Sequence, residues 1–106
     1  MKFDIDDHSL GKVKDHTYWI DLDNYDQTLD TKTGVFIFAS ANHHVRYIGK
    51  AEPGNMLSAV RGAKDAGKDW QATLVKALYT GSTEATRSLK KGLKMKYQPL
   101  NNDNIG

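Results

Sequence analysis

Two short apolar runs separated by a polar segment constrain the fold of this chain more than any other feature. Val35–Ala39 is an uninterrupted apolar run, and Val45–Gly49 is a second segment rich in β-branched and aromatic residues. Both compositions favour strands. Residues 40–44, Ser-Ala-Asn-His-His, supply turn-forming side chains between them. The pattern therefore predicts a β-hairpin over residues 35–49.

Two helices are predicted downstream of the hairpin. Asn55 is a suitable N-cap for a helix over residues 56–66. Ser82 is a suitable N-cap for a second helix over residues 83–97, which Pro99 ends.

Two further segments are predicted as strands. Residues 17–22 and 70–79 are rich in aromatic and aliphatic side chains, although 70–79 also fits a helix. Trp19 and Trp70 lie in these segments, and we expect both in the core rather than as platforms for stacked bases. The order of elements predicts a small α+β domain around an antiparallel sheet.

Charge is divided unevenly along the chain. Residues 1–33 carry eight Asp and four Lys, a net charge of −4, whereas residues 34–106 carry a net charge of +6. This asymmetry is typical of a polyanion-binding body with an acidic extension. The alternative is that both parts are ordinary solvated surface. Residues 1–12 contain few apolar anchors, so we expect them to be loosely attached.

Composition excludes several classes of protein. The length of 106 residues and an apolar content of 39% fit one domain with a modest core. The absence of cysteine excludes disulfides, thiolate metal sites and a cysteine nucleophile. No apolar run approaches the ~20 residues of a membrane span, and the N-terminus lacks the apolar stretch of a signal peptide. We therefore expect a soluble, cytoplasmic protein with no membrane partner.

Basic side chains concentrate on one side of the helix predicted over residues 83–97. Helical projection gives an inner apolar stripe that consists of Ala85, Leu89, Leu93 and Tyr97. Another side, an arc of roughly 100°, carries Arg87, Lys90, Lys91 and Lys94, with Lys90 at the border between the two faces. Four basic residues with no acid among them favour an anion-binding surface. The alternative is an ordinary solvated lysine face.

The hairpin and the end of the last helix resemble the GIY-YIG nucleases. Gly34-Val35-Phe36 followed after ten residues by Tyr47-Ile48-Gly49-Lys50 is similar to the signature of that family. Residues 97–102, Tyr-Gln-Pro-Leu-Asn-Asn, are similar to its C-terminal helix end, as in the nuclease domain of bacterial excision-repair proteins. The resemblance covers residues 34–102 and implies a three-stranded antiparallel sheet flanked by helices. It leaves residues 1–33 as an acidic N-terminal extension with an extra strand, and residues 103–106 as a tail.

The resemblance also implies a metal-dependent site, from which this chain departs at two positions. In active members two tyrosines, a lysine, a helix arginine and a metal-binding glutamate form the site. The catalytic candidates that match are Tyr47, Lys50 and Arg61. Phe36 stands where the first tyrosine belongs, and Lys90 stands where the glutamate belongs. A charged lysine cannot ligate a hard cation, but it attracts phosphate, so we expect an impaired site without metal or cofactor.

Three functions are compatible with these observations. The first is a catalytically impaired GIY-YIG-like domain that binds nucleic acid or another phosphate-bearing polyanion through Lys50, Arg61, Arg87, Lys90, Lys91 and Lys94. The second is an endonuclease with a rearranged Mg²⁺ site, which needs a carboxylate from among Glu52, Asp65, Asp69 and Glu84. The third is a small protein-binding adaptor or inhibitor on a disabled nuclease fold. In that case the acidic N-terminal segment contacts a protein partner or covers the basic face of its own chain.

Overall fold

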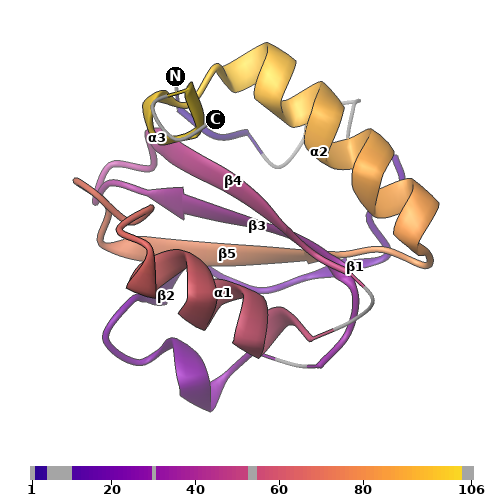
Figure 1. Cartoon of the computed structure of the whole chain (residues 1–106), viewed down its shortest axis with the longest axis horizontal. Coiled ribbons are helices and arrows are strands. Elements are labelled where there is room, and N and C mark those ends of the chain that lie inside the picture. Colours follow the sequence, from indigo (N-terminus) through magenta and orange to yellow (C-terminus); the bar gives the residue numbers. More distant parts are fainter. Residues whose placement is uncertain (1, 5–10, 30, 53–54, 104–106) are drawn as a thin grey trace.

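A computed structural model of the chain describes residues 2–4, 11–29, 31–52 and 55–103. They form an open antiparallel sheet with α1 and α2 on opposite faces (Figure 1). The strands, in spatial order, are β1 (Asp15–His16), β5 (Leu74–Tyr79), β3 (Gly34–Ala39) and β4 (Val45–Ala51), and β2 (Ile20–Asp21) also pairs with β5. The α+β class is therefore confirmed. The sheet has five strands, whereas three strands and one extra strand in the N-terminal extension are predicted.

The predicted hairpin is confirmed as β3 and β4. Phe36 lies opposite Gly49, and Ile37 lies opposite Ile48. Every residue of β3 is buried, because β4 and β5 flank it and a helix covers each face. An uninterrupted apolar run suits a strand that is buried on both faces. A Cβ atom at position 49 would collide with the Phe36 ring, so glycine lets that ring lie across β4.

Alternation along the strands divides the core into two clusters. The first lies under α1 (Met56–Asp65) and includes Phe36, Phe38, Val75, Ala77, Met56 and Val60. The second lies under α2 (Thr83–Tyr97) and includes Val35, Ile37, Ile48, Leu78, Leu89 and Leu93. The sheet is thus a middle layer between two helices.

Both predicted helices and their caps are confirmed. The Asn55 side chain accepts a hydrogen bond from the Ser58 N–H at 3.1 Å, and the Ser82 hydroxyl accepts one from the Ala85 N–H at 3.1 Å. The buried stripe of α2 differs in one member, because Thr86 is fully buried in place of Ala85. The Thr86 hydroxyl lies 2.7 Å from the Thr80 hydroxyl, and this hydrogen bond allows the polar side chain to be buried. The helical projection does not place Thr86 in the apolar stripe. None of the helices described is long and apolar enough to cross a membrane.

The strand predicted over residues 17–22 is wrong in extent. β1 and β2 are separate two-residue pairings with β5, and Thr17 lies between them. The Thr17 hydroxyl accepts a hydrogen bond from the Ala77 N–H at 3.0 Å, which replaces a backbone partner and interrupts the ladder. The short 3-10 helix η2 (Tyr25–Gln27) follows.

The first residues are attached more firmly than their composition predicts. Phe3 is buried, and its ring packs against Trp19 and Tyr97 at centroid distances of 5.9 and 5.6 Å. Its N–H donates to the His43 carbonyl at 2.9 Å. One aromatic anchor is enough to hold residues 2–4 on the α2 face, so the expectation of loose attachment is wrong for them. Residues 5–10 lie outside the described residues.

The predicted third strand and the C-terminal end also need correction. β5 begins at Leu74, and Trp70 precedes it in a turn with its side chain 55% exposed, so it is not a core residue. Residues 100–103 form a short helix, α3 (Leu100–Asp103), so the expected tail does not begin at position 103. The α2 helix ends at Tyr97, and the C-cap residue Gln98 has a positive φ of 45° that reverses the chain before Pro99. Residues 104–106 lie outside the described part.

Candidate functional site

The asparagine pair of α3 holds two segments at the free edge of β4. Asn102 is buried; its Oδ1 accepts a hydrogen bond from the Ile48 N–H at 2.8 Å, and its Nδ2 donates to the Ile48 carbonyl at 2.9 Å. Asn101 Nδ2 donates to the carbonyls of Lys68 and Trp70 at 2.8 and 2.9 Å. Asn102 therefore supplies hydrogen-bond partners for the edge backbone of β4 at Ile48. Asn101 holds the turn that follows α1 beside this edge.

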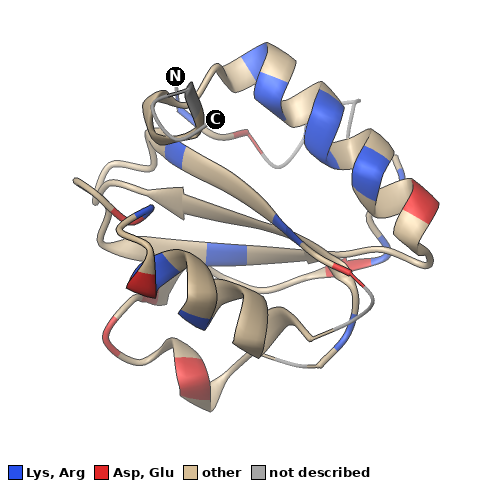
Figure 2. Cartoon of the chain, in the orientation of Figure 1, with Lys and Arg blue, Asp and Glu red and all other residues tan. Residues whose placement is uncertain are grey.

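A basic groove lies between β4 and α2. It has a volume of about 320 Å³ and is lined by Lys50, Arg87, Lys90, Lys91, Lys94 and Met95. Figure 2 shows the basic residues as a series of bands along α2, with further bands on β4. Like charges packed this closely repel one another, and an anion between them relieves that repulsion. We refer to this feature as the basic groove.

Glu52 is held by two of the cations. Its Oε1 lies 2.7 Å from Lys50 Nζ, and Arg87 Nε donates to Oε1 and Oε2 at 2.9 and 3.2 Å. The Glu52 side chain is only 10% exposed. Hydrogen bonds from Lys50 and then Arg87 lower the pKa of Glu52. The carboxylate thus contacts these cations through the kind of charge-assisted bonds that a phosphate group would make.

Lys90 lies at the border of the buried and exposed faces of α2, as the helical projection predicts. It is half-buried. Burial lowers the pKa of Lys90, and the positive charges of Lys94, Lys50 and Lys68 lower it further, against the opposing effect of Glu52. Its ammonium is therefore under-solvated and surrounded by like charge. A bound anion would offset both effects.

Tyr47 lies on the other face of β4 from Lys50, because side chains alternate along a strand. Its ring packs against those of Phe36 and Phe38 at 6.0 and 5.8 Å, and Lys68 Nζ lies 5.7 Å from the ring centroid. Burial raises the pKa of Tyr47. The two positions that the resemblance treats as paired tyrosines, Phe36 and Tyr47, are therefore in contact, on the α1 side of the sheet.

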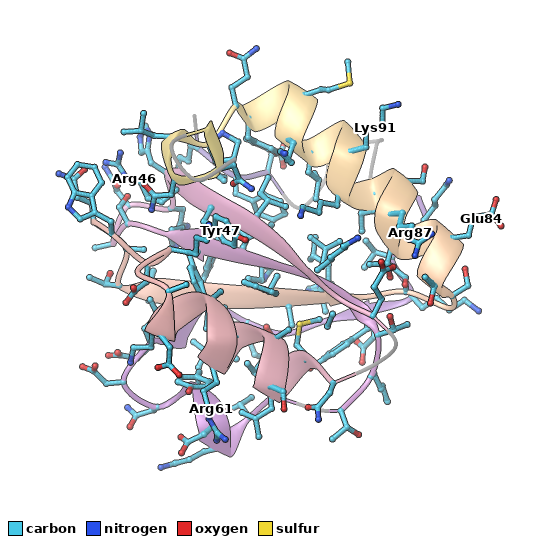
Figure 3. The ribbon with its side chains drawn as sticks, viewed as in Figure 1. Arg46, Tyr47, Arg61, Glu84, Arg87 and Lys91 are labelled. Atoms are coloured by element: carbon cyan, nitrogen blue, oxygen red, sulfur yellow. The ribbon has the colours of Figure 1, made fainter. Side chains whose placement is uncertain are left out.

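Arg61 is the candidate that does not join the others. It is exposed on α1, and Figure 3 shows it on the side of α1 turned away from α2. The remaining predicted nucleic-acid contacts, namely Lys50, Arg87, Lys90, Lys91 and Lys94, all line the basic groove. The catalytic set implied by the resemblance is spread over both faces of β4 and the outer face of α1.

Sequence reasoning missed two participants in this site. Glu52 was a candidate metal ligand, yet its carboxylate pairs with Lys50 and Arg87. Positions 50 and 52 share one side of an extended chain, and this spacing could have identified the Lys50 pair. Lys68 follows α1 and lies over Tyr47, a contact that depends on the turn held by Asn101. No local pattern could have identified it.

The described carboxylates and histidines do not form a metal centre. No group of three or more His, Asp or Glu side chains in this part of the chain could hold a metal ion. Glu84 lies exposed at the start of α2 (Figure 3).

A second hollow, of about 440 Å³, adjoins the N-terminus of α2. It is lined by Gly11, Lys12, Lys14, Gly81, Ser82, Glu84 and Ala85. Lys12 Nζ donates to the Ser88 hydroxyl at 2.8 Å, and Glu84 contributes a negative charge. The density of positive charge is therefore lower here than in the basic groove.

No protein-family model matches this chain, and no curated protein sequence matches it either. The resemblance to the GIY-YIG nucleases rests on the hairpin motif, on the helix that follows it and on residues 97–102.

Proposed function

We propose that the basic groove binds a phosphate-bearing polyanion, with nucleic acid as the expected ligand, and that it does so without cleaving it. The convergence of five cationic side chains on one groove is the observation that supports this function. The half-buried position of Lys90 strengthens the case, because a partly desolvated ammonium gains more from an anion than an exposed one does.

The ion pair of Glu52 indicates the mode of binding. Lys50 and Arg87 already contact a pair of anionic oxygens at 2.7–3.2 Å, so their head groups are positioned to bind a phosphate. Lys90, Lys91 and Lys94 extend the charge along α2. The ligand would displace Glu52 or bind beside it. The ammonium at position 90, where the GIY-YIG resemblance places a metal-binding carboxylate, supports binding rather than hydrolysis.

Salt dependence of binding tests this proposal. Labelled DNA and RNA oligonucleotides would be titrated at several salt concentrations, because each phosphate contact releases about one counterion. Lys90→Ala is expected to weaken binding and to reduce the slope of log Kd against log salt by roughly one unit. Lys96→Ala is the matched control on the same helix, since Lys96 does not line the groove. Failure to bind either oligonucleotide, or binding that ignores salt, would overturn the proposal.

Two additions separate the alternatives. Arg61→Ala is expected to leave binding unchanged if the basic groove is the site, and to weaken it if the arrangement implied by the resemblance is the site. A parallel titration with Mg²⁺ detects cleavage. Cleavage that disappears in Glu52→Gln would identify a rearranged endonuclease site instead. A protein that binds no nucleic acid under any of these conditions would leave the adaptor function.

A further inference from the structure

Trp70 is one of the large apolar residues that are exposed in the described part of the chain. Its side chain is 55% exposed, that of Leu100 is 46% exposed, and that of Met95 is 69% exposed. Met95 also lines the basic groove. A large aromatic ring that is more than half exposed is not a core residue, and its open face is accessible to a ligand.

The turn that carries Trp70 is rigidly held. The Trp70 carbonyl accepts a hydrogen bond from Asn101, which is buried and also binds the Lys68 carbonyl. The Ala72 N–H donates to the Asp69 carbonyl at 2.8 Å and closes the turn. Gln71 adopts a φ of +60°, a backbone conformation that is costly for a residue with a side chain. The backbone under the indole is therefore fixed, although the indole itself is largely in solvent.

Lys68 supplies a positive charge two positions before Trp70, beside β4. Its ammonium lies 5.7 Å from the Tyr47 ring centroid, and its charge acts on Lys90. Arg46, at the start of β4, adds a guanidinium at the end of the sheet where this turn enters β5. Its buried Nε has no hydrogen-bond partner in the described structure. Two basic residues, Lys68 and Arg46, thus lie at the end of the sheet where the turn of Trp70 enters β5.

We propose that Trp70 is a stacking platform for a nucleobase, so that the protein prefers single-stranded nucleic acid to duplex. This inference rests on the proposed function, since the basic groove must first hold the phosphates. In a duplex both faces of each base are already stacked, whereas an unpaired base can stack on an indole. Stacking on aromatic side chains is tolerant of sequence and is found together with basic grooves in single-strand-binding proteins.

Three ligands of equal length separate stacking from phosphate binding. They are a single-stranded oligonucleotide, the same sequence as a duplex, and an abasic oligonucleotide that keeps the phosphates but lacks the bases. Wild-type protein is expected to bind the single strand most tightly at one fixed salt concentration. Trp70→Ala is expected to weaken single-strand binding about 5- to 100-fold and to leave abasic binding unchanged. Trp70→Phe, which keeps an aromatic ring, is expected to retain most of the affinity.

Tyr18→Ala is the matched control, because Tyr18 is 88% exposed and does not line the groove. If Trp70→Ala binds the single strand as wild type does, or if duplex and single strand bind equally, the stacking inference fails while the proposed function stands. If the wild-type protein binds none of the three ligands, the proposed function fails and the stacking inference with it. Trp70→Phe also controls for misfolding. If Trp70→Ala and Trp70→Phe both lose single-strand affinity and both have a lowered Tm, Trp70 has a structural role and the inference is overturned.

Discussion

The two edges of the sheet are finished in opposite ways. Beyond β5, the N-terminal segment adds β1 and β2, so acidic and aromatic residues from the first part of the chain complete that side. Beyond β4 no strand is added in the described structure. Lys2 forms an isolated bridge with His44 just before β4, and α3 covers one further point through Asn102. The uncovered remainder adjoins the basic groove. Short strands cover the β5 side of the sheet, and charged side chains flank the β4 side. Both arrangements discourage pairing with strands of other molecules.

This difference explains the uneven distribution of charge. Asp15 and Asp21 belong to β1 and β2, which pair with β5, and Asp23 and Asp26 follow in the next turn and in η2. The basic residues of β4 lie on the opposite edge strand, and those of α2 lie on the helix that covers one face of the sheet (Figure 2). The acid that contacts the cations of the basic groove is Glu52, whereas none of these four aspartates lines the groove. A net charge of only +2 can therefore result from an acidic surface and a basic surface on different parts of the molecule.

The largest expected effect concerns the apolar anchor of the N-terminal segment. Phe3 packs edge-on against Trp19, which lies between β1 and β2. Phe3→Ala is expected to lower the free energy of unfolding by about 3 kcal/mol, because it removes a buried ring and leaves a cavity. Urea denaturation measures the change. Tyr18→Ala, at an exposed aromatic one position from Trp19, is expected to cost less than about 0.5 kcal/mol. Equal losses in the two variants would mean that burial of the Phe3 ring does not anchor residues 2–4.

A smaller loss is expected at the opposite edge. Asn102→Ala removes both hydrogen bonds to Ile48 and leaves its N–H and carbonyl unpaired. The free energy of unfolding is expected to fall by about 2 kcal/mol. Asn24→Ala is the matched control, because Asn24 is exposed and its side chain makes no capping hydrogen bond. If both asparagine variants melted at the same temperature, α3 would not be needed to close β4.

Removal of the negative charge in the groove is expected to have a modest effect on binding. Glu52→Gln keeps the side chain's shape but frees Lys50 and Arg87 from their ion pairs, so oligonucleotide affinity is expected to rise roughly three- to tenfold. Fluorescence anisotropy at low salt would measure it. Asp26→Asn makes the same charge change on η2, near the opposite edge, and is expected to alter affinity much less. Weaker binding in Glu52→Gln would show that the carboxylate orients the cations rather than competing with the ligand.

The smallest expected effect is a dependence on alkaline pH. Because burial and then neighbouring charge lower the pKa of Lys90, it loses its proton at a lower pH than an exposed lysine does. Anion affinity is expected to fall as the pH rises toward the ordinary lysine value of about 10.4. Lys90→Arg keeps its charge throughout and is expected to flatten this part of the profile.

The lowered pKa of Lys90 also affects the stability of the fold, which is expected to increase over the pH range in which anion affinity falls. In that window the unfolded chain binds more protons at position 90 than the folded chain does, so the free energy of unfolding gains a contribution that increases with pH. Thermal denaturation of wild-type protein and Lys90→Arg over this range checks the sign. Identical profiles for the two proteins, in both binding and stability, would place Lys90 in ordinary solvent.

The hairpin, both long helices and their caps were determined by the sequence alone. Local signals specify them, because an apolar run without polar interruption suits β3, and Asn55 and Ser82 satisfy helix ends within a few residues of chain. Helical projection also predicted Lys90 at the border of α2, since helix geometry fixes which side chains share a face. Four of the five cations of the basic groove were already visible on that one helix.

Only the tertiary structure decided how the remaining parts meet. Trp70 reads as a strand residue in sequence, yet hydrogen bonds from Asn101 hold its turn outside the sheet. Phe3 stands in a polar segment, and its burial depends on an aromatic cluster assembled from three distant stretches. Glu52 faces Arg87 across 35 positions of chain, and Arg61 lies on the side of α1 that is turned away from α2 (Figure 3). Such contacts depend on which faces pack together, and one local sequence pattern is compatible with several packings.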